Sequence, residues 1–202
     1  MLFHNELIDG LVRGRLVSHA RGSILELNVG TGANFPHYPS SVSVTGTDLS
    51  HRMIAAAKKE AERCGIQAEF VRASVENLNF PAAHFDTVLS TLSLCGYEDP
   101  VMVLRRMRDW CKPDGVVLLM EHGLSRYLPV RAAQLALNDL HYRHIGCYLD
   151  RDLGQLLVAS RLAVTRIDFS PLGITQLIWA TPDPRPLGLS SKRSANAGPP
   201  IL

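Results

Sequence analysis

A short apolar run that ends in a glycine-containing turn, within residues 23–35, constrains the fold of this chain more than any other feature. The run predicts a buried strand, and the turn is expected to lead into a helix. In α/β proteins a parallel strand that enters such a turn holds adenosine-containing ligands, because the missing side chains let the ligand approach the backbone N–H groups. Glu26, four positions before Gly30 and six before Gly32, adds an acidic residue near the end of the strand.

Three interpretations of this turn stay open on its residues alone. A dinucleotide site expects G-x-G-x-x-G, in which the third glycine lets the helix pack closely. From Gly30 the sequence is Gly-Thr-Gly-Ala-Asn-Phe, so the third glycine is missing and a nicotinamide-dependent reductase is disfavoured. The others are a site for a different adenosine-containing cofactor and a plain strand-to-helix turn.

The composition of the 202-residue chain is that of an ordinary globular protein of one domain. Hydrophobic residues make up 46%, which argues against disorder of the whole chain, and a net charge of +2 gives no indication of nucleic acid as a partner. Four cysteines without a C-x-x-C pair fit a reducing compartment inside the cell, such as the cytoplasm or the mitochondrial matrix. No apolar run is long enough to suggest a transmembrane segment.

Strands and helices are expected to alternate along the chain. Period-2 or continuous apolar runs predict strands at residues 23–27, 41–47, 68–72, 84–92 and 116–121, then a closing hairpin of 163–169 and 174–181. Helical spacing and capping residues predict helices at residues 6–19, 53–61, 100–111, 130–140 and 152–160. This order specifies an α/β fold with a doubly wound, mostly parallel sheet.

Asp48 ends the second expected strand, about 20 positions after the glycine turn, where such folds hold a ribose. One carboxylate can accept hydrogen bonds from both ribose hydroxyls. Asp48 or Ser50 also suits a helix N-cap, and the two roles are compatible.

Five segments of the chain, taken in order, resemble the class I S-adenosylmethionine (SAM)-dependent methyltransferases across roughly residues 22–181. The segments are Ile-Leu-Glu-Leu-Asn-Val-Gly-Thr-Gly-Ala-Asn (24–34), Thr-Gly-Thr-Asp-Leu-Ser (45–50), Glu-Asn-Leu-Asn-Phe-Pro (76–81), His-Phe-Asp-Thr-Val (84–88) and Lys-Pro-Asp-Gly (112–115). Shorter strings resemble the branch of alkyl-thiol methyltransferases and bacterial phospholipid- or quinone-methylase-type relatives: 30–39, 92–95, 120–123 and 146–151. The resemblance implies a Rossmann-like sheet of seven strands that ends in an antiparallel hairpin.

The resemblance also implies roles for individual residues, with SAM as the cofactor. Gly30, Thr31 and Gly32 would line the amino-acid part of SAM, and Glu26 would support the loop. Asp48 would hold the ribose and Leu49 would pack on the adenine. Ser74 and Val75 would meet the adenine edge, and Thr91 would sit beside the methionine moiety. Asp86 would be a structural acid in the fourth strand.

Two positions depart from the pattern of the family. Asn28 stands where the first glycine is usual, and Asn tolerates a positive φ best after Gly. Ser74 replaces an Asp that often reads the adenine amino group, and its hydroxyl lacks charge assistance. These departures keep an alternative open: a weakly active or inactive scaffold subunit of a larger complex, for instance a mitochondrial one.

Catalysis would need a nucleophile held close to the methyl group, and His122 is the candidate base because it ends the fifth strand. We expect residues 1–181 to form the methyltransferase domain, with a lead-in helix within 1–21 and an acceptor-side insertion at 124–151. Tyr38 is expected near the mouth of the acceptor pocket. Residues 182–202 have the composition of a disordered Pro/Ser/basic tail.

The expected partner is a small-molecule or lipid-like acceptor. Arg143, His144 and Arg151 of the insertion could contact an acidic head group or another protein, and the tail could also contact a protein. His141, His144 and Cys147 could be imagined as metal ligands, but we expect no metal because such residues are usually partly exposed helix positions.

Overall fold

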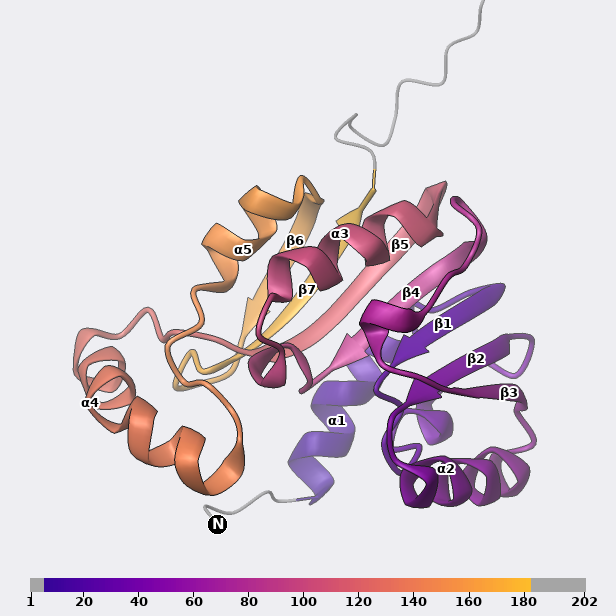
Figure 1. The fold of residues 1–202 in the computed structure, drawn as a ribbon, viewed down its shortest axis with the longest axis horizontal. Helices are drawn as coiled ribbons and strands as arrows, with labels where there is room; N and C mark the ends of the chain where they lie inside the picture. Colours follow the sequence, from indigo (N-terminus) through magenta and orange to yellow (C-terminus); the bar gives the residue numbers. More distant parts are fainter. Residues whose placement is uncertain (1–5, 183–202) are drawn as a thin grey trace, which may run out of the picture.

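The computed structural model describes the backbone of residues 6–182 and the side chains of residues 10–182. One sheet of seven strands runs through it in the order β3-β2-β1-β4-β5-β7-β6 (Figure 1). The strands are β1 (Ser23–Leu27), β2 (Ser43–Asp48), β3 (Gln67–Arg72), β4 (Phe85–Thr91), β5 (Cys111–His122), β6 (Ala163–Phe169) and β7 (Thr175–Thr181). β1 to β5 pair in parallel, whereas β7 pairs antiparallel with β5 and β6. The predicted doubly wound, mostly parallel sheet with an antiparallel C-terminal hairpin is confirmed.

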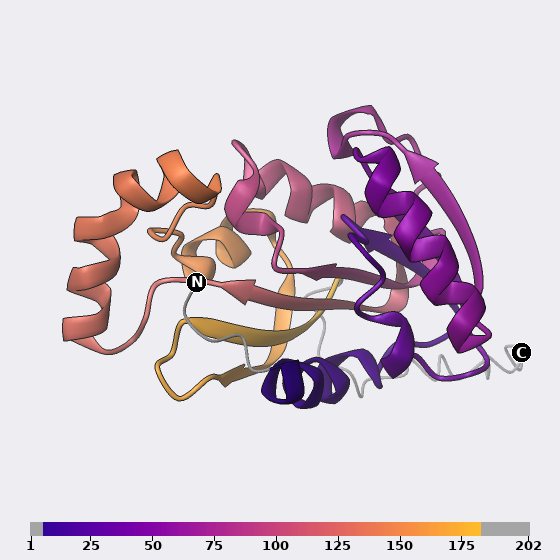
Figure 2. The same ribbon diagram turned by 90° about the horizontal axis from the view of Figure 1, so that it is seen from below.

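Helices cover both faces of this sheet. They are α1 (Glu6–Val17), α2 (His51–Cys64), α3 (Pro100–Trp110), α4 (Leu128–Ile145) and α5 (Leu153–Ser160). α3 and α5 pack on one face through side chains such as Met107 and Leu157, and α1 and α2 pack on the other through Leu16 and Ala57. Figure 2 shows α1 on the opposite side of the sheet from α3 and α5. No helix of the part that the structure describes has the length and apolar character needed to cross a membrane.

Local sequence explains where α2 and α3 begin and end. The Ser50 hydroxyl accepts a hydrogen bond from the Met53 N–H, and Gly65 ends α2 with a φ of 67°. Asp99 caps α3 in the same way, with Pro100 at the first helical position, where its missing N–H costs nothing.

The helix expected after the glycine turn is wrong. A three-residue 3-10 helix, Phe35–His37, stands in its place, and the chain then enters β2. Pro39 accounts for the difference, because a proline disfavours helical backbone in the residue before it, and Tyr38 is extended with ψ at 143°. Leu16 and Val17 of α1 pack in the same buried cluster as Phe35 of this short helix.

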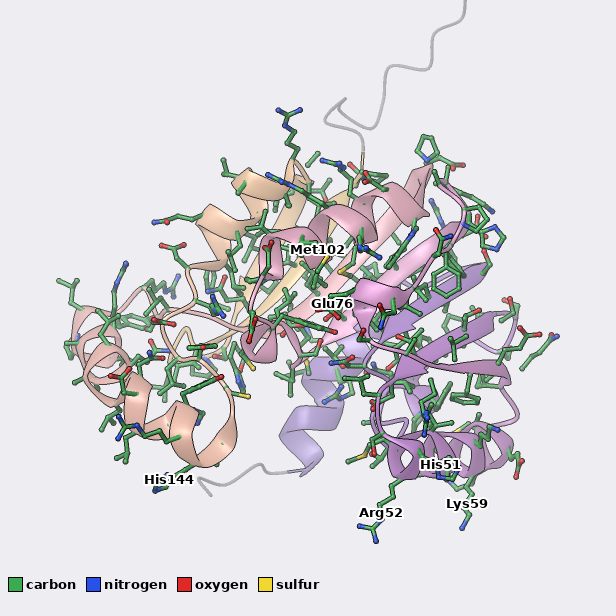
Figure 3. The ribbon with its side chains drawn as sticks, viewed as in Figure 1. His51, Arg52, Lys59, Glu76, Met102 and His144 are labelled. Atoms are coloured by element: carbon green, nitrogen blue, oxygen red, sulfur yellow. The ribbon has the colours of Figure 1, made fainter. Side chains whose placement is uncertain are left out.

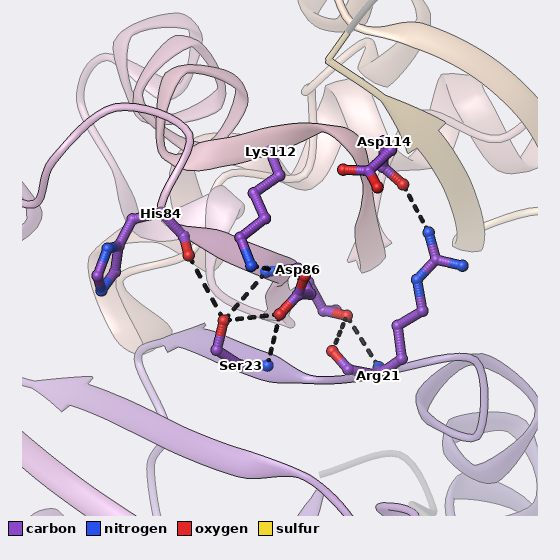
Figure 4. A network of polar contacts seen from close by, with 7 residues as sticks. Arg21, Ser23, His84, Asp86, Lys112 and Asp114 are labelled. Carbon is purple, nitrogen blue, oxygen red and sulfur yellow. Dashed lines mark hydrogen bonds and ion pairs between the residues drawn. The ribbon is translucent and has the colours of Figure 1, made fainter. Parts of the chain in front are cut away.

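Asp86 holds the amino ends of β1, β4 and β5 together (Figure 4). The glycine turn follows the opposite, carboxyl end of β1. Its carboxylate accepts hydrogen bonds from the backbone N–H and the hydroxyl of Ser23, both at 2.9 Å, and from the Lys112 ammonium at 2.7 Å. The Lys112 ammonium, followed by the Ser23 backbone N–H, lowers the pKa of Asp86 to about 2. These contacts fit the structural role implied for this acid.

α4 extends well beyond the expected residues 130–140 and projects away from the sheet at one end of the molecule (Figures 1 and 2). Gln134 is its one buried residue. The Gln134 side chain donates to the Gly123 carbonyl at 3.0 Å and accepts from the Ser125 N–H at 2.8 Å. α4 is therefore held at its middle, and most of its surface is open.

The C-terminal tail expected at residues 182–202 lies, apart from residue 182, outside the described residues.

Candidate functional site

A cavity of about 310 Å³ opens at the carboxyl ends of the parallel strands. Four residues predicted for the site lie in its wall: Asn28, Leu49, Ser74 and Val75. The rest of the wall is Glu76, Ser93, Gly96, Tyr97 and Glu98. Glu76 lies near the centre of the molecule in Figure 3, at this edge of the sheet. A larger hollow of about 500 Å³ between the segment after β3 and α3 contains none of the predicted residues.

The glycine turn adopts the left-handed backbone that its residues allow. φ is 51° at Asn28, 56° at Gly30 and 87° at Gly32. Asn28 lies in the wall of the cavity and does not fill it, so the turn survives the loss of the usual first glycine.

The two glycines of the turn face different surroundings. A Cβ at Gly30 would meet nothing closer than the Asn28 carbonyl oxygen at 4.0 Å, so this position borders open space. A Cβ at Gly32 would lie 2.5 Å from Cδ2 of Phe35 and 3.1 Å from Cβ of Glu60. Gly30 thus leaves room for a ligand against the backbone, whereas Gly32 is required by packing.

Asp48 lies beside this open space, at the carboxyl end of β2. Its Oδ2 accepts a hydrogen bond from the Gly30 N–H at 3.0 Å, and its Oδ1 accepts one from the Ser50 N–H at 2.8 Å. Each carboxylate oxygen has a further lone pair, so the group can accept two more hydrogen bonds, as a ribose with two hydroxyls requires.

The positions predicted for an adenine ring combine an exposed apolar side chain with backbone groups. Leu49 is 66% exposed next to Asp48, although large apolar side chains are usually covered. Val75 is buried, and its carbonyl accepts a hydrogen bond from the Arg106 guanidinium at 3.0 Å. The Arg106 contact fixes the chain that carries Ser74 and Val75 past the cavity.

Glu26 is a buried acceptor for the turn and the segment that follows it. Its Oε1 accepts from the Asn34 amide at 2.6 Å and its Oε2 from the Tyr38 hydroxyl at 2.7 Å. Burial raises the pKa of Glu26 to about 7, although the two hydrogen bonds and the nearby Arg13 oppose this. Tyr38 is 8% exposed and supports Glu26, so its expected place at the mouth of an acceptor pocket is wrong.

Arg13 brings α1 into the site. Its guanidinium donates to Oδ1 of Asn34 at 2.9 Å and to Oγ1 of Thr91 at 3.0 Å, and it is 6% exposed. Thr91 also accepts from the Asn34 amide at 3.1 Å, so one cluster joins α1, the glycine turn and β4. The predicted Glu26 and Thr91 therefore lie together, linked through Asn34.

Glu121 anchors the loop after β4 that forms part of the cavity wall. This fully buried carboxylate accepts from the backbone N–H groups of Ser93 at 2.9 Å and Leu94 at 3.0 Å, and from the Ser90 hydroxyl at 2.7 Å. Burial raises its pKa to about 7, opposed by these three hydrogen bonds.

His122, the predicted base, is the last residue of β5 and pairs with Thr175 of β7. Alternation along the strand puts it on the face of Leu118 and Met120, which is the face that α1 covers. His122 is not among the residues that line the 310 Å³ cavity. The structure places His122 at the expected carboxyl edge of the sheet. It lies outside the cavity that is lined by the residues predicted to contact adenine.

The candidate metal ligands on the insertion make other contacts. Nδ1 of His141 lies 2.9 Å from the Cys147 carbonyl oxygen, and the Cys147 thiol contacts Cys95. His144 projects from the end of α4 away from the sheet (Figure 3).

The sequence analysis assigned no role in the site to Arg13 and Asn34, and it did not predict that Glu121 anchors the loop after β4. Arg13 left a signal, because it stands three and four positions before Leu16 and Val17 on the buried stripe of α1. Asn34 and Glu121 left no comparable signal in the sequence. The partners of Asn34 lie 8 to 57 positions away along the chain, and those of Glu121 lie 27 to 31 positions away.

Comparisons with known proteins agree with this geometry. Residues 25–119 match the family described as "Methyltransferase domain". The chain is 30% identical over 168 residues to phosphatidylethanolamine N-methyltransferase of Cereibacter sphaeroides, covering 80% of this chain and 82% of that protein. It is also 30% identical over 186 residues to human thiol S-methyltransferase TMT1B, covering 90% of this chain and 75% of that protein.

A solved structure supports the fold: the PH0226 protein from Pyrococcus horikoshii superposes with a TM-score of 0.69 at 19% identity, over 91% of this chain and 92% of the other. With the sheet order, the glycine turn and the two relatives, it shows that the chain belongs to the class I SAM-dependent methyltransferases.

Proposed function

We propose that this methyltransferase binds SAM across the carboxyl edge of β1, β2 and β4 and transfers its methyl group to a small, apolar or lipid-like acceptor. The observation that carries the proposal is the contact between the Gly30 N–H and the Asp48 carboxylate, beside open space and a cavity of about 310 Å³. A backbone without a Cβ, a carboxylate with spare lone pairs and an exposed Leu49 are the features that a nucleoside needs from a protein.

Each part of the cofactor has a proposed set of residues. Asp48 accepts hydrogen bonds from the ribose hydroxyls, and Leu49 covers one face of the adenine. Ser74 and Val75 meet the adenine edge. The other predicted positions border the amino-acid part: Gly30, Thr31 and Gly32 directly, and Thr91 and Glu26 through the cluster with Asn34.

When bound, SAM supplies an electrophilic methyl group, and the protein has to align a nucleophile with it and remove a proton where the nucleophile carries one. We assign the proton removal to His122, at the carboxyl end of β5. A thiol suits this arrangement, because its ordinary pKa of about 8.5 requires only a modest shift towards the thiolate.

The acceptor class rests on α4 and on the relatives. Three leucines of α4, Leu135, Leu137 and Leu140, are each more than half exposed, which suits an apolar acceptor more than a charged one. One relative is named for phosphatidylethanolamine and the other for thiols, so the proposed acceptor is an apolar thiol or a phospholipid, whose acyl chains are apolar.

The alternative of an inactive scaffold depended on the Pro-rich basic tail, which lies outside the described residues apart from residue 182, and on Asn28 and Ser74. Both lie in the wall of a cavity that remains open between them. This arrangement supports retained binding of SAM.

Two measurements test the proposal. Calorimetry with SAM, and with its product S-adenosylhomocysteine, should give saturable binding and a rise in unfolding temperature. Incubation with methyl-labelled SAM should label an alkyl thiol or phosphatidylethanolamine in vesicles. Absence of binding at millimolar SAM would overturn the proposal, whereas binding without label on either acceptor would overturn only the acceptor class.

A further inference from the structure

We infer that Cys95 and Cys147 are an oxidation-sensitive pair that forms a reversible disulfide and ties the insertion to the cavity wall. Cys95 lies in the short helix Leu94–Gly96 after β4, and Cys147 lies in the chain that returns from α4. Their sulfur atoms are 3.1 Å apart although the residues are 52 positions apart in the sequence. Both thiols are free in the structure.

The backbone geometry around the pair suits a disulfide. The N–H of Tyr148 donates to the Cys95 carbonyl oxygen at 3.0 Å, so the two chain segments already lie side by side at the cysteines. The Arg151 guanidinium donates to the Tyr97 carbonyl at 2.7 Å and holds the same two segments together, two residues after Cys95 and four after Cys147. The bonded distance between disulfide sulfur atoms is about 2.05 Å, so the two atoms have to move only about 1 Å closer.

The two thiols differ in a way that assigns their roles. Cys95 is 1% exposed, and burial followed by the Cys147 contact raises its pKa, so it is a poor first target. Cys147 is partly exposed. Other cysteines lack such a neighbour: Cys111 is buried beside Gly115, and Cys64 lies near Glu60 and Arg63.

The oxidation balances with a peroxide as the oxidant. The Cys147 sulfur attacks one oxygen of hydrogen peroxide, the O–O bond breaks, and a sulfenic acid and one water form. The Cys95 sulfur then attacks the sulfenic sulfur, the S–O bond breaks, and a second water leaves with the thiol proton. Two thiols and one peroxide thus give one disulfide and two waters, and a dithiol reductant reverses the change.

The disulfide would act on α4 and the segment that follows it, which have few buried contacts with the rest of the protein. α4 has one buried residue, and the segment after it contacts the sheet side of the molecule through Cys95, Tyr97 and neighbouring backbone. Gly96 and Tyr97 are in the cavity wall. A disulfide at Cys95 would therefore fix the end of α4 against this wall and restrict opening between them.

Peptide mapping tests the bond directly. The purified full chain is treated with hydrogen peroxide, alkylated, unfolded without reductant and digested with trypsin, which releases residues 73–105 and 144–151. The expected result is a peptide pair whose mass is about 2 units below the sum of the two peptides, and which dithiothreitol separates. It should also form in C64S, the matched control, and be absent from C95S and C147S.

Limited proteolysis of the folded protein tests the consequence. Oxidation should slow trypsin cleavage at Arg143 of α4 several-fold, and dithiothreitol should restore the rate; in C147S, peroxide should leave it unchanged. The inference is overturned if wild-type protein gives sulfinic acid or mixed pairings with Cys64 or Cys111 in place of the expected pair. Wild-type mapping needs no variant to fold and no methyl transfer, so it decides independently of the proposed function.

Discussion

The backbone N–H of Gly30 donates to the Asp48 carboxylate at 3.0 Å, which joins the glycine turn after β1 to the end of β2. The contact gives two separated elements of the site one fixed geometry. It also leaves the carboxylate with capacity for further donors, because the only other described donor to it is the Ser50 N–H. A ligand with two adjacent hydroxyls completes this arrangement.

Replacing Asp48 should weaken SAM binding. We expect Asp48→Ala to raise the dissociation constant by about 10- to 100-fold, because hydrogen bonds to a charged group are worth roughly 1.5–3 kcal/mol. Calorimetry measures the change. Asp109→Ala, on the exposed side of α3, is the control and should bind as the wild type does. Equal affinity of the folded Asp48→Ala variant would remove Asp48 from the cofactor site.

The two glycines of the turn should separate binding from stability. Gly30→Ala costs about 1–2 kcal/mol for a left-handed backbone, and its methyl group enters the open space, so SAM binding should be lost while the fold survives. Gly32→Ala adds a contact at 2.5 Å with Phe35 and should lower the unfolding free energy by roughly 2–4 kcal/mol. Urea denaturation and calorimetry on both variants check this. Tight SAM binding by Gly30→Ala would contradict the proposed position of the cofactor.

The sequence predicted the parts of this site that depend on short spacings. Gly30 follows β1 and Asp48 ends β2, and the carboxyl ends of parallel strands meet at one edge, so their proximity follows from topology. The helix predicted after the turn is wrong, because that prediction rests on the general pattern of strand, turn and helix. The pattern does not take into account that Pro39 disfavours helical backbone at Tyr38.

Contacts between distant segments could not be predicted in the same way. Arg13 meets Thr91 across 78 positions, and Cys95 meets Cys147 across 52. Nothing in the local sequence of either pair names its partner, because the contact exists only once α1 and the chain after α4 pack against the sheet. The spacing of the cysteines in the sequence therefore gives no indication that Cys95 and Cys147 lie together.

Removing the charge of Asp86 should lower stability at neutral pH and cost less in acid. Its pKa of about 2 lies below the ordinary value of about 3.9, so its contribution is present above pH 4 and is lost as the pH falls towards 2. We expect Asp86→Asn to cost about 1–2 kcal/mol at pH 7, since partial exposure screens the pair with Lys112. Urea denaturation at pH 7 and pH 3 measures both values.

Asp114→Asn is the matched control for Asp86→Asn. Arg21 contacts the backbone carbonyl of Asp114 and not its carboxylate, so this change should leave stability nearly unaltered (Figure 4). A cost for Asp86→Asn that is the same at both pH values would contradict the assigned role of its charge.

His122 should affect turnover more than binding. If it removes the proton of the acceptor, His122→Ala lowers kcat by about 10²- to 10⁴-fold with little change in the affinity for SAM, and the loss shrinks as rising pH ionises a thiol acceptor. Steady-state kinetics from pH 6 to 9 measure this. His84→Ala is the control, because His84 directly precedes the amino end of β4, whereas His122 lies at the carboxyl end of β5. Unchanged turnover in His122→Ala would exclude it as the base.

Glu121 should make the wild type less stable as the pH rises. Burial raises its pKa to about 7 from an ordinary value of about 4.3, so the folded state binds more protons than the unfolded state between these values. The unfolding free energy therefore falls with rising pH across this window. Glu26, whose pKa is also about 7, contributes in the same direction.

Glu121→Gln should reduce this pH dependence and keep the fold. Its amide oxygen can accept from the Ser93 and Leu94 N–H groups, and its amide nitrogen can donate to the Ser90 hydroxyl, so no buried group loses its partner. Glu121→Ala leaves both N–H groups without an acceptor and should cost roughly 2–4 kcal/mol. Urea denaturation at pH 5 and pH 8 separates the effects: we expect Glu121→Gln to lose less stability than the wild type between these values, with the remaining slope due to Glu26. Equal losses in both proteins would mean that Glu121 is already ionised in the folded state at pH 5, and that its three hydrogen bonds outweigh its burial.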